Sequence, residues 1–274
     1  MLLVPVFCGF QWRKFTTPNP STSPGTSITA GADTKGSWGQ IAAALDEDVY
    51  GFLLWIVAGA VSGAQRDYLI DIGVDPAGGT NYVPIISDIL AHQASRAVDC
   101  GRQYYFPMFI KAGARVGARA QGNGANTIRV AGIFYGKPTN PEVALVGQYS
   151  ETIGVSGNGG TSLTPGASGA EGSWVSLGTT TKHLWWWQLC VGFSTTVTTS
   201  KMYYFDLAVG DDTNKDIILE NVALYHPGTA ERTGQTLSMD GFWDVPAGST
   251  LYVRGSCSGA TDSGCNALAV GVGG

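Results

Sequence analysis

The sequence predicts an all-β protein in which two tandem antiparallel β-sandwich domains, jelly-roll-like and related by internal duplication, follow an extended N-terminal arm. Three observations predict this class. The 274 residues include 39 Gly and 12 Pro, which separate short apolar runs as tight turns separate strands. Within the runs, apolar and polar residues alternate with a period of two, the pattern of half-buried strands. Several stretches also occur twice in the same order.

The repeated stretches define the duplicated module. TSITAGADTKGSW recurs as TSLTPGASGAEGSW, YLIDIGVD as YYFDLAVGD, FIKAGARVGAR as WDVPAGSTLYVR, and TIRVAGIFYG as CNALAVGVGG. The offset is 136 residues for the first match (174 − 38), 135 for the next two (206 − 71 and 254 − 119) and 138 for the last (274 − 136). The equivalent residues are Trp38 and Trp174, Asp71 and Asp206, Arg119 and Arg254, and Gly136 and Gly274. Four markers in one order at nearly constant spacing indicate two copies of one domain.

The repeat divides the chain into four parts. We expect an N-terminal arm over residues 1–25, a first sandwich over 26–137, a linker over 138–160 and a second sandwich over 161–274. The linker is assigned by the Pro and Gly residues of KPTNPEVALVGQYSETIGVSGNGG. In VPIISDILAHQA a helix competes with a strand, although the proline and the β-branched residues disfavour the helix.

The N-terminal arm is apolar and too short to fold by itself. It begins MLLVPVFCGF, and its first positive residues, Arg13 and Lys14, follow the apolar stretch, so we do not expect a signal peptide. Its large side chains must be buried on its own domain or, as we expect, on a neighbouring protein. The candidate interface residues of the arm are Phe7, Phe10, Trp12 and Phe15.

The stretch HLWWWQLCVG, residues 183–192, places three tryptophans side by side. On a strand, Trp185, Trp187 and Leu189 share one face, which matches an apolar face of the first copy and is predicted to be the core. Trp186 is then a surplus apolar residue on the outer face. It lies under loops of its own domain, contacts another subunit, or forms a platform for a sugar ring. We include Trp186 among the candidate interface residues.

Composition and motifs predict neither catalysis nor nucleic-acid binding. The net charge is −5 and the basic residues are scattered singly, so no direct contact with nucleic acid is expected. No apolar run approaches the roughly 18–20 residues of a membrane-spanning helix. His92, His183 and His226 lack metal-ligand spacing, and no GxSxG or phosphate-binding loop occurs. We therefore expect no enzymatic activity, no cofactor and no catalytic or metal site.

Three chemical alternatives stay open. The acidic stretch GDDTNKD, residues 210–216, is a solvated loop or a calcium site that lacks the full motif of about 12 residues. Cys257 and Cys265 flank a short loop and form a disulfide across a hairpin or, as we expect for cytoplasmic assembly, stay reduced. Two distant carboxylates could also serve as the acid and base of a glycosidase, which sequence spacing does not test.

Two pairs of charged residues occupy equivalent places on apolar strands of the two copies. We expect Asp71 to meet Arg119, and Asp206 to meet Arg254, across a sheet. A charge-assisted hydrogen bond of this kind fixes strand register, so the predicted role is structural and not catalytic.

The repeated stretches resemble virion structural proteins of tailed bacteriophages. The resemblance is carried by GTSITAGADTKGSW, YLIDIGVD, YYFPMFIKAGARVGARAQG and VPAGSTLYVRGSCSGATDSGCNALAVGVGG, which cover most of both copies. The group is a loose one of tail-fibre, baseplate and head-decoration components, and no binding residue can be transferred from it. The resemblance implies β-sandwich or jelly-roll modules, assembly in multiple copies and no enzymatic activity.

The expected function is therefore that of a structural component of a phage virion, assembled in the host cytoplasm and attached to the tail or fibre. The expected partners are other virion proteins and further copies of this chain in a homo-oligomer, with a host surface glycan as a further candidate. The alternatives are a capsid decoration protein of cement or head-fibre type, a carbohydrate-binding module using exposed tryptophans such as Trp186 or Trp243, and a secreted glycosidase.

Overall fold

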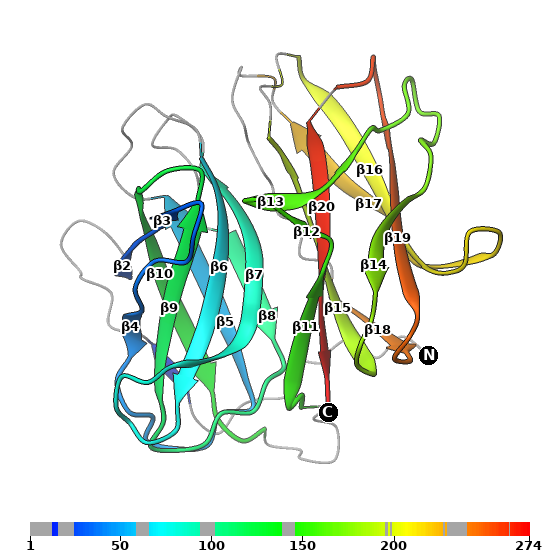
Figure 1. Cartoon of the computed structure of the whole chain (residues 1–274). Helices are drawn as coiled ribbons and strands as arrows, with labels where there is room; N and C mark the ends of the chain where they lie inside the picture. Colours follow the sequence, from blue (N-terminus) through cyan, green and yellow to red (C-terminus); the bar gives the residue numbers. More distant parts are fainter. Residues whose placement is uncertain are drawn as a thin grey trace.

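The computed structural model shows β-strands joined by turns and loops, with no helix among the residues that it describes. These are residues 13–15, 25–58, 66–93, 102–138, 146–194, 197, 199–226, 228, 240–262 and 264–274. The strands form four sheets, which pack as two sandwiches side by side (Figure 1). The predicted all-β class is confirmed.

The first sandwich consists of sheets 1a and 1b. Sheet 1a contains β1 (Arg13–Phe15), β2 (Thr26–Thr29), β5 (Gly51–Ala58), β8 (Arg102–Phe106) and β10 (Thr127–Tyr135). Sheet 1b contains β3 (Gly31–Ala32), β4 (Gly39–Ala42), β6 (Arg66–Asp75), β7 (Val83–Gln93) and β9 (Arg115–Gly122). The order is β1-β10-β5-β8 in sheet 1a, where β2 also pairs with β10, and β3-β9-β6-β7 in sheet 1b, where β4 also pairs with β9.

The second sandwich consists of sheets 2a and 2b. Sheet 2a contains β11 (Tyr149–Ile153), β12 (Val155–Ser156), β13 (Gly159–Leu163), β15 (Leu184–Phe193), β18 (Asp240–Val245) and β20 (Cys265–Gly273). Sheet 2b contains β14 (Val175–Thr179), β16 (Lys201–Gly210), β17 (Lys215–His226) and β19 (Thr250–Cys257). The order is β12-β13-β20-β15-β18 in sheet 2a, where β11 also pairs with β20, and β14-β19-β16-β17 in sheet 2b.

Six consecutive strands of each sandwich follow the same path. In both copies the first, fourth and sixth of these strands form one sheet, as β10-β5-β8 and β20-β15-β18, and the others form the second, as β9-β6-β7 and β19-β16-β17. A duplicated module would produce this arrangement, although the duplication itself stays a prediction. The pairing shifts one sequence match: Ile133 lies opposite Leu53, as Val270 lies opposite Gln188, so β10 and β20 are offset by 137 residues (270 − 133) instead of 138.

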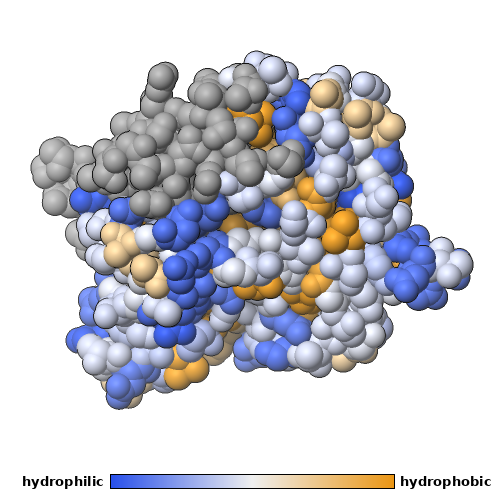
Figure 2. Space-filling model, turned by 45° about the horizontal axis from the view of Figure 1, so that its top comes forward, coloured by the Kyte–Doolittle hydropathy of each residue, from blue (hydrophilic) through white to orange (hydrophobic). Residues whose placement is uncertain are grey.

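Figure 2 shows the most hydrophobic residues visible on one face of the molecule in several separate small patches. At the far side of the second sandwich, the loop between β16 and β17 projects as a hydrophilic finger (Figures 1 and 2).

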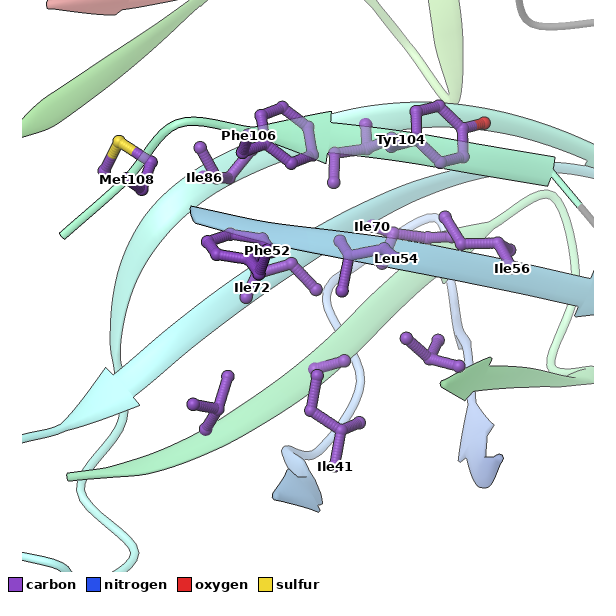
Figure 3. Packing of buried hydrophobic residues seen from close by; sticks show 14 of the residues in the cluster. Ile41, Phe52, Leu54, Ile56, Ile70, Ile72, Ile86, Tyr104, Phe106 and Met108 are labelled. Atoms are coloured by element: carbon purple, nitrogen blue, oxygen red, sulfur yellow. The ribbon is translucent and has the colours of Figure 1, made fainter. Parts of the chain in front are cut away.

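Alternation of side chains along each strand builds the core of the first sandwich. Phe52, Leu54 and Ile56 of β5 alternate with outward residues and face Ile70 and Ile72 of β6, as Figure 3 shows. All five are at most 5% exposed. The second sandwich has a separate core, to which Trp187 and Leu189 of β15 contribute.

The segment VPIISDILAHQA, for which the sequence left a helix and a strand open, forms strand β7. Its β-branched residues favour extended backbone. Pro84, which cannot donate a backbone hydrogen bond, lies near the start of a strand that is the edge of its own sheet, where proline is tolerated. The pairing of β7 with β6 shifts register between Ile86 and Ile89. Asp88 in this bulge has a φ of 57°.

The predicted arm and linker both contribute strands. Within the predicted arm, residues 13–15 form β1, which pairs with β10 of the same sandwich. Within the predicted linker, β11, β12 and the start of β13 belong to sheet 2a, and β11 pairs with β20 over five residues. The glycines of the predicted linker lie in tight turns between these strands, as Gly157 does with a φ of 58°. This segment is therefore part of the second sandwich and not a free connector.

Candidate functional site

The outer face of sheet 2a packs against the side of the first sandwich that is formed by edge strands β7 and β8 (Figure 1). Trp186 of β15 is 1% exposed, and its ring centre lies 5.6 Å from that of Phe106 of β8. The other members of this outer face are buried in the same cluster as the core of the first sandwich; they are Cys190, Leu268, Val270 and Val272. One apolar core therefore runs through the first sandwich into the face of the second.

Trp186 is buried within its own chain. Two of the three sequence interpretations, a contact with another subunit and a platform for a sugar ring, require an exposed Trp186 and therefore do not apply. Trp186 is covered by the other sandwich of its own chain, which provides a buried aromatic partner. The interpretation of Trp186 as an exposed interface residue is wrong, because no sequence pattern states which neighbouring domain covers an outer face.

Trp185 is not in the predicted core. Leu184 and Trp187 both point into the second core, three residues apart, because the pairing with β18 shifts register between them. Trp185 lies outside that core and stacks on Phe242 of β18, with ring centres 5.9 Å apart and planes 3° apart. Both rings pack against the apolar cluster that contains Trp186. Trp185 and Trp186 thus belong to the junction of the sandwiches, whereas Trp187 belongs to the second core.

Hydroxyl groups cover the free edge of β7 at the same contact. Ser150 of β11 donates to the carbonyl oxygen of Ile85 over 2.6 Å, and Thr152 donates to the carbonyl oxygen of Ser87. An uncovered edge would expose unpaired backbone groups to other chains. The second sandwich therefore closes both the apolar side and the polar edge of the first.

Gly147 joins the two sandwiches by a close approach of backbone. Its N–H donates to the carbonyl oxygen of Pro107 over 2.6 Å. A Cβ at this position would lie 2.1 Å from Cγ1 of Val272, far inside van der Waals contact. Only glycine fits between the two sandwiches here.

The remaining interface residues predicted from the sequence lie in the arm. Phe7, Phe10 and Trp12 fall outside the described residues. Phe15 is part of β1 and lies opposite Ile133 of β10. This end of the arm is therefore paired within its own sandwich, whereas we expected the arm to dock on a neighbouring protein.

The structure brings the first predicted pair of charged residues together. Asp71 of β6 lies opposite Arg119 of β9, and the guanidinium Nε donates to Asp71 Oδ2 over 2.8 Å. Asp71 Oδ1 accepts from the Lys35 ammonium over 2.6 Å and from the backbone N–H of Asp88 over 3.0 Å. The Arg119 guanidinium also lies over the Trp38 ring, 4.6 Å from its centre.

The second predicted pair repeats this arrangement. Arg254 donates to Asp206 Oδ2 from Nε over 2.9 Å, and its Nη2 lies 2.8 Å from the same oxygen. The backbone N–H of Asn221, which has a φ of 52°, donates to Asp206 Oδ1 over 2.7 Å. Arg254 lies 4.4 Å from the centre of the Trp174 ring. Glu171 stands at the place of Lys35 and lies 3.5 Å from Arg254 Nε.

Each buried aspartate therefore links three parts of its sandwich: a central strand, the arginine of the next strand and the bulge of the edge strand. Asp71 is 1% and Asp206 2% exposed. Both carboxylate oxygens of each are occupied by donors, as a buried charge requires. Sequence reasoning found the aspartates and arginines by their repetition. It marked Trp38 and Trp174 as equivalent but did not predict their contacts with the arginines, nor the hydrogen bonds of the bulge residues, because these depend on tertiary structure.

The cysteines among the described residues are free thiols. Cys190, Cys257 and Cys265 are all buried, so the expected reduced state of the last two agrees with the structure. Burial raises the pKa of the Cys190 thiol to about 12. Burial also raises the pKa of Cys265, with the nearby Asp262 carboxylate adding to the effect. Protonated, inert thiols are the result.

Other polar residues make separate local contacts. His183 Nε2 lies 2.5 Å from Asp244 Oδ1, and His226 Nδ1 accepts from the backbone N–H of Gly228 over 3.0 Å. In the acidic loop, Asp211 Oδ1 accepts from the N–H groups of two following residues, which lowers the pKa of that carboxyl. Within the described part of the chain, no three His, Cys, Asp or Glu side chains are grouped to hold a metal ion.

The second sandwich exposes apolar side chains on the two edge strands β17 and β18. Tyr225 is 49%, Trp243 47% and Ile217 37% exposed. The described residues include five large hydrophobic side chains that are exposed, and three of them lie on these two strands. The remaining two are Val83 and Val155. Ile217 and Tyr225 lie near opposite ends of β17, and Trp243 lies on β18.

No family model matches the chain, and no curated protein matches it. Among solved structures it is similar to PNGF-II, with 8% identity and a TM-score of 0.39, over 90% of this chain and 64% of that chain. It is also similar to PNGase F, a glycosylasparaginase from Flavobacterium meningosepticum, with 6% identity and a TM-score of 0.38 over 96% of each chain.

A third similar chain belongs to the structure of Broad Bean Stain Virus, with 10% identity and a TM-score of 0.32 over 93% of each chain. The chain spans less than two thirds of the length of PNGF-II. All three TM-scores are below 0.5, so these likenesses assign no activity and no partner to this chain. Among the described residues, no helix is long and apolar enough to cross a bilayer.

Proposed function

We propose that this chain is a non-enzymatic structural component of a bacteriophage virion, attached to the tail, fibre or baseplate and assembled in multiple copies. In this role its partners are other virion proteins and further copies of itself. The resemblance of its repeated stretches to virion structural proteins of tailed phages supports the proposal. A decoration protein of the capsid, of cement or head-fibre type, is the alternative within the same class.

One observation carries the proposal: apolar surface on the second sandwich is exposed where its counterpart on the first is covered. Met108, next to the end of β8, is 1% exposed and bridges to the backbone of Gly147. Its counterpart at the offset of 135 residues (243 − 108) is Trp243, which is 47% exposed. A protein that hides such a surface in one half and offers it in the other is suited to assembly.

The use of charged residues also favours a structural role. The buried carboxylates of Asp71 and Asp206 have both oxygens engaged by donors of their own sandwich. A general acid or base needs a carboxylate that is free to exchange a proton with a substrate. These two groups instead hold strands and bulges in register.

Labelling of particles tests the proposal. Antibodies raised against the purified chain are applied to phage particles produced from a genome that carries the gene, and gold labels are located by electron microscopy. We expect labels at one place on intact particles, on the tail side. Labels on the head would favour capsid decoration, and particles without label or without the chain in mass spectrometry would contradict a virion role.

A carbohydrate-binding module is the second candidate, and the exposure of Trp243 favours it. An exposed indole on an edge strand can stack on a sugar ring, whereas Trp186 is buried and unavailable. Binding of the isolated chain to a glycan array, lost in Trp243→Ala and kept in Val155→Ala, would support this function. Absence of glycan binding by the unmodified chain would remove it.

A further inference from the structure

The contact between the two sandwiches uses two surfaces, and each has a counterpart elsewhere on the chain. The first surface, here the edge side, is formed by edge strands β7 and β8 of the first sandwich. The second, here the sheet face, is the outer face of sheet 2a. Because the six strands follow the same path in both sandwiches, the counterpart edge side is formed by β17 and β18, and the counterpart sheet face is the outer face of sheet 1a.

The counterpart edge side lacks the cover that its equivalent has. On the first sandwich, the carbonyl groups of β7 accept from β11, and Phe106 of β8 packs on Trp186. On the second sandwich, β17 pairs with β16 alone and β18 with β15 alone among the described strands. Tyr225 and Trp243 are half exposed there.

The counterpart sheet face is apolar. Leu53 and Trp55 of β5 stand where Gln188 and Cys190 stand on β15, and both are half-buried. Ile133 of β10 corresponds to Val270 by its pairing. Further along the face, the rings of Tyr105 and Tyr135 lie 6.3 Å apart. This face thus carries large apolar side chains, of which Leu53 and Trp55 are half-buried and Ile133 is 7% exposed.

The charges on the two counterpart surfaces are opposite. β17 carries Asp216 and Glu220, both exposed. Sheet 1a carries Arg129 on its outer face, by its place in the alternation of β10. Opposite charges favour the pairing of these two surfaces over the pairing of either with itself.

We infer that the edge side of the second sandwich, formed by β17 and β18, binds the outer face of sheet 1a of a second copy of this chain. This contact between two copies would have the same form as the contact between the two sandwiches within a single chain. This inference rests on the proposed structural function. It identifies a second copy of the chain as one partner and names the two surfaces that bind. The two surfaces differ, so the interface is head-to-tail. Such an interface closes into a ring or continues as a filament.

Complementary variants test the inference. The face variant is Trp55→Arg, and the edge variant combines Tyr225→Arg with Trp243→Arg, at exposed positions that tolerate the change. Sedimentation velocity is expected to show assemblies larger than 28.7 kDa for the unmodified full chain and 28.7 kDa monomers for each variant alone. An equimolar mixture of the two variants is expected to form a dimer of about 57 kDa, twice the monomer mass, and nothing larger.

The dimer in the mixture also shows that both variants fold, since each must supply one intact surface. If Trp55→Arg does not fold, Arg129→Glu replaces it and changes the charge of the face without altering the core. Val155→Arg, at a position that is 41% exposed and outside both surfaces, is the matched control and is expected to assemble like the unmodified chain.

Three outcomes would overturn the inference. An unmodified chain that stays monomeric, variants that still assemble, or a mixture that stays monomeric each excludes this head-to-tail contact. None of them removes the proposed virion role, which the labelling of particles decides separately. A chain that assembles in solution but is missing from particles would keep the inference and remove that role.

Discussion

At the scale of single residues, buried polar side chains hold the sandwiches in register. Asp71 and Asp206 each accept hydrogen bonds from an arginine of the neighbouring strand and from a backbone N–H in the bulge of an edge strand. The aspartates themselves are buried, so these donors replace the water that their carboxylates would otherwise bind. The repetition of aspartate and arginine made these pairs predictable. Their link to the bulge could not be foreseen, since the bulge depends on how β7 and β17 pair.

Asp206→Asn is expected to lower the free energy of unfolding by about 2–3 kcal/mol, because it removes the buried charge that accepts hydrogen bonds from Arg254 and from the bulge. Urea denaturation followed by fluorescence measures the change. Asp216→Asn, on an exposed part of β17, is the control and should stay within about 0.5 kcal/mol. An equal small loss in both variants would contradict the structural role.

The buried thiols predict a dependence of stability on pH. Burial raises the pKa of Cys190 from 9.0 to about 12 and also raises that of Cys265. The folded state therefore keeps its protons in a range where the unfolded state loses them, so this contribution is complete below pH 9 and falls as pH rises toward 12. In reducing buffer we expect the free energy of unfolding to drop by up to about 1.4 kcal/mol per pH unit for each thiol.

Denaturation curves at pH 8 to 10.5 measure this dependence. Cys190→Ala should show a shallower fall with pH than the unmodified chain, because one of the titrating groups is gone. A slope that is unchanged in Cys190→Ala would mean that the Cys190 thiol is accessible to water in the folded state.

At the scale of elements, β15 shows what a sequence pattern can and cannot determine. Alternation placed Trp187 and Leu189 in the core correctly. It failed for Trp185, because a register shift at the start of the strand breaks the period of two. The alternation predicted that the side chain of Trp186 has to be covered. It could not predict which surface covers this side chain, because that depends on how the two sandwiches pack together. Within the predicted linker, glycines mark turns between paired strands, which their sequence alone does not distinguish from a free connector.

Trp186→Ala is expected to cost about 3–5 kcal/mol, the usual range for a large aromatic removed from a core. It should also separate the unfolding of the two sandwiches, because it opens the one apolar cluster that runs through both. Calorimetry of the full chain is expected to change from one transition to two. Trp243→Ala, at an exposed position, should keep one transition. A single unshifted transition in Trp186→Ala would show that the junction contributes little.

At the scale of the whole molecule, the two sandwiches form one body with unequal ends. The side of the first sandwich that is formed by β7 and β8 is closed by the second, whereas the equivalent side of the second, formed by β17 and β18, exposes Tyr225 and Trp243. The predicted duplication of one module would explain why equivalent surfaces occur covered and uncovered on one chain. Assembly with other protein molecules would bury the uncovered copy.

The mass of the full chain in solution, measured by sedimentation equilibrium in reducing buffer over a wide range of concentrations, decides whether the chain assembles with itself. We expect masses that rise well above 28.7 kDa as concentration increases, because the exposed apolar side of the second sandwich binds a second copy. A constant mass of 28.7 kDa at every concentration would contradict this expectation.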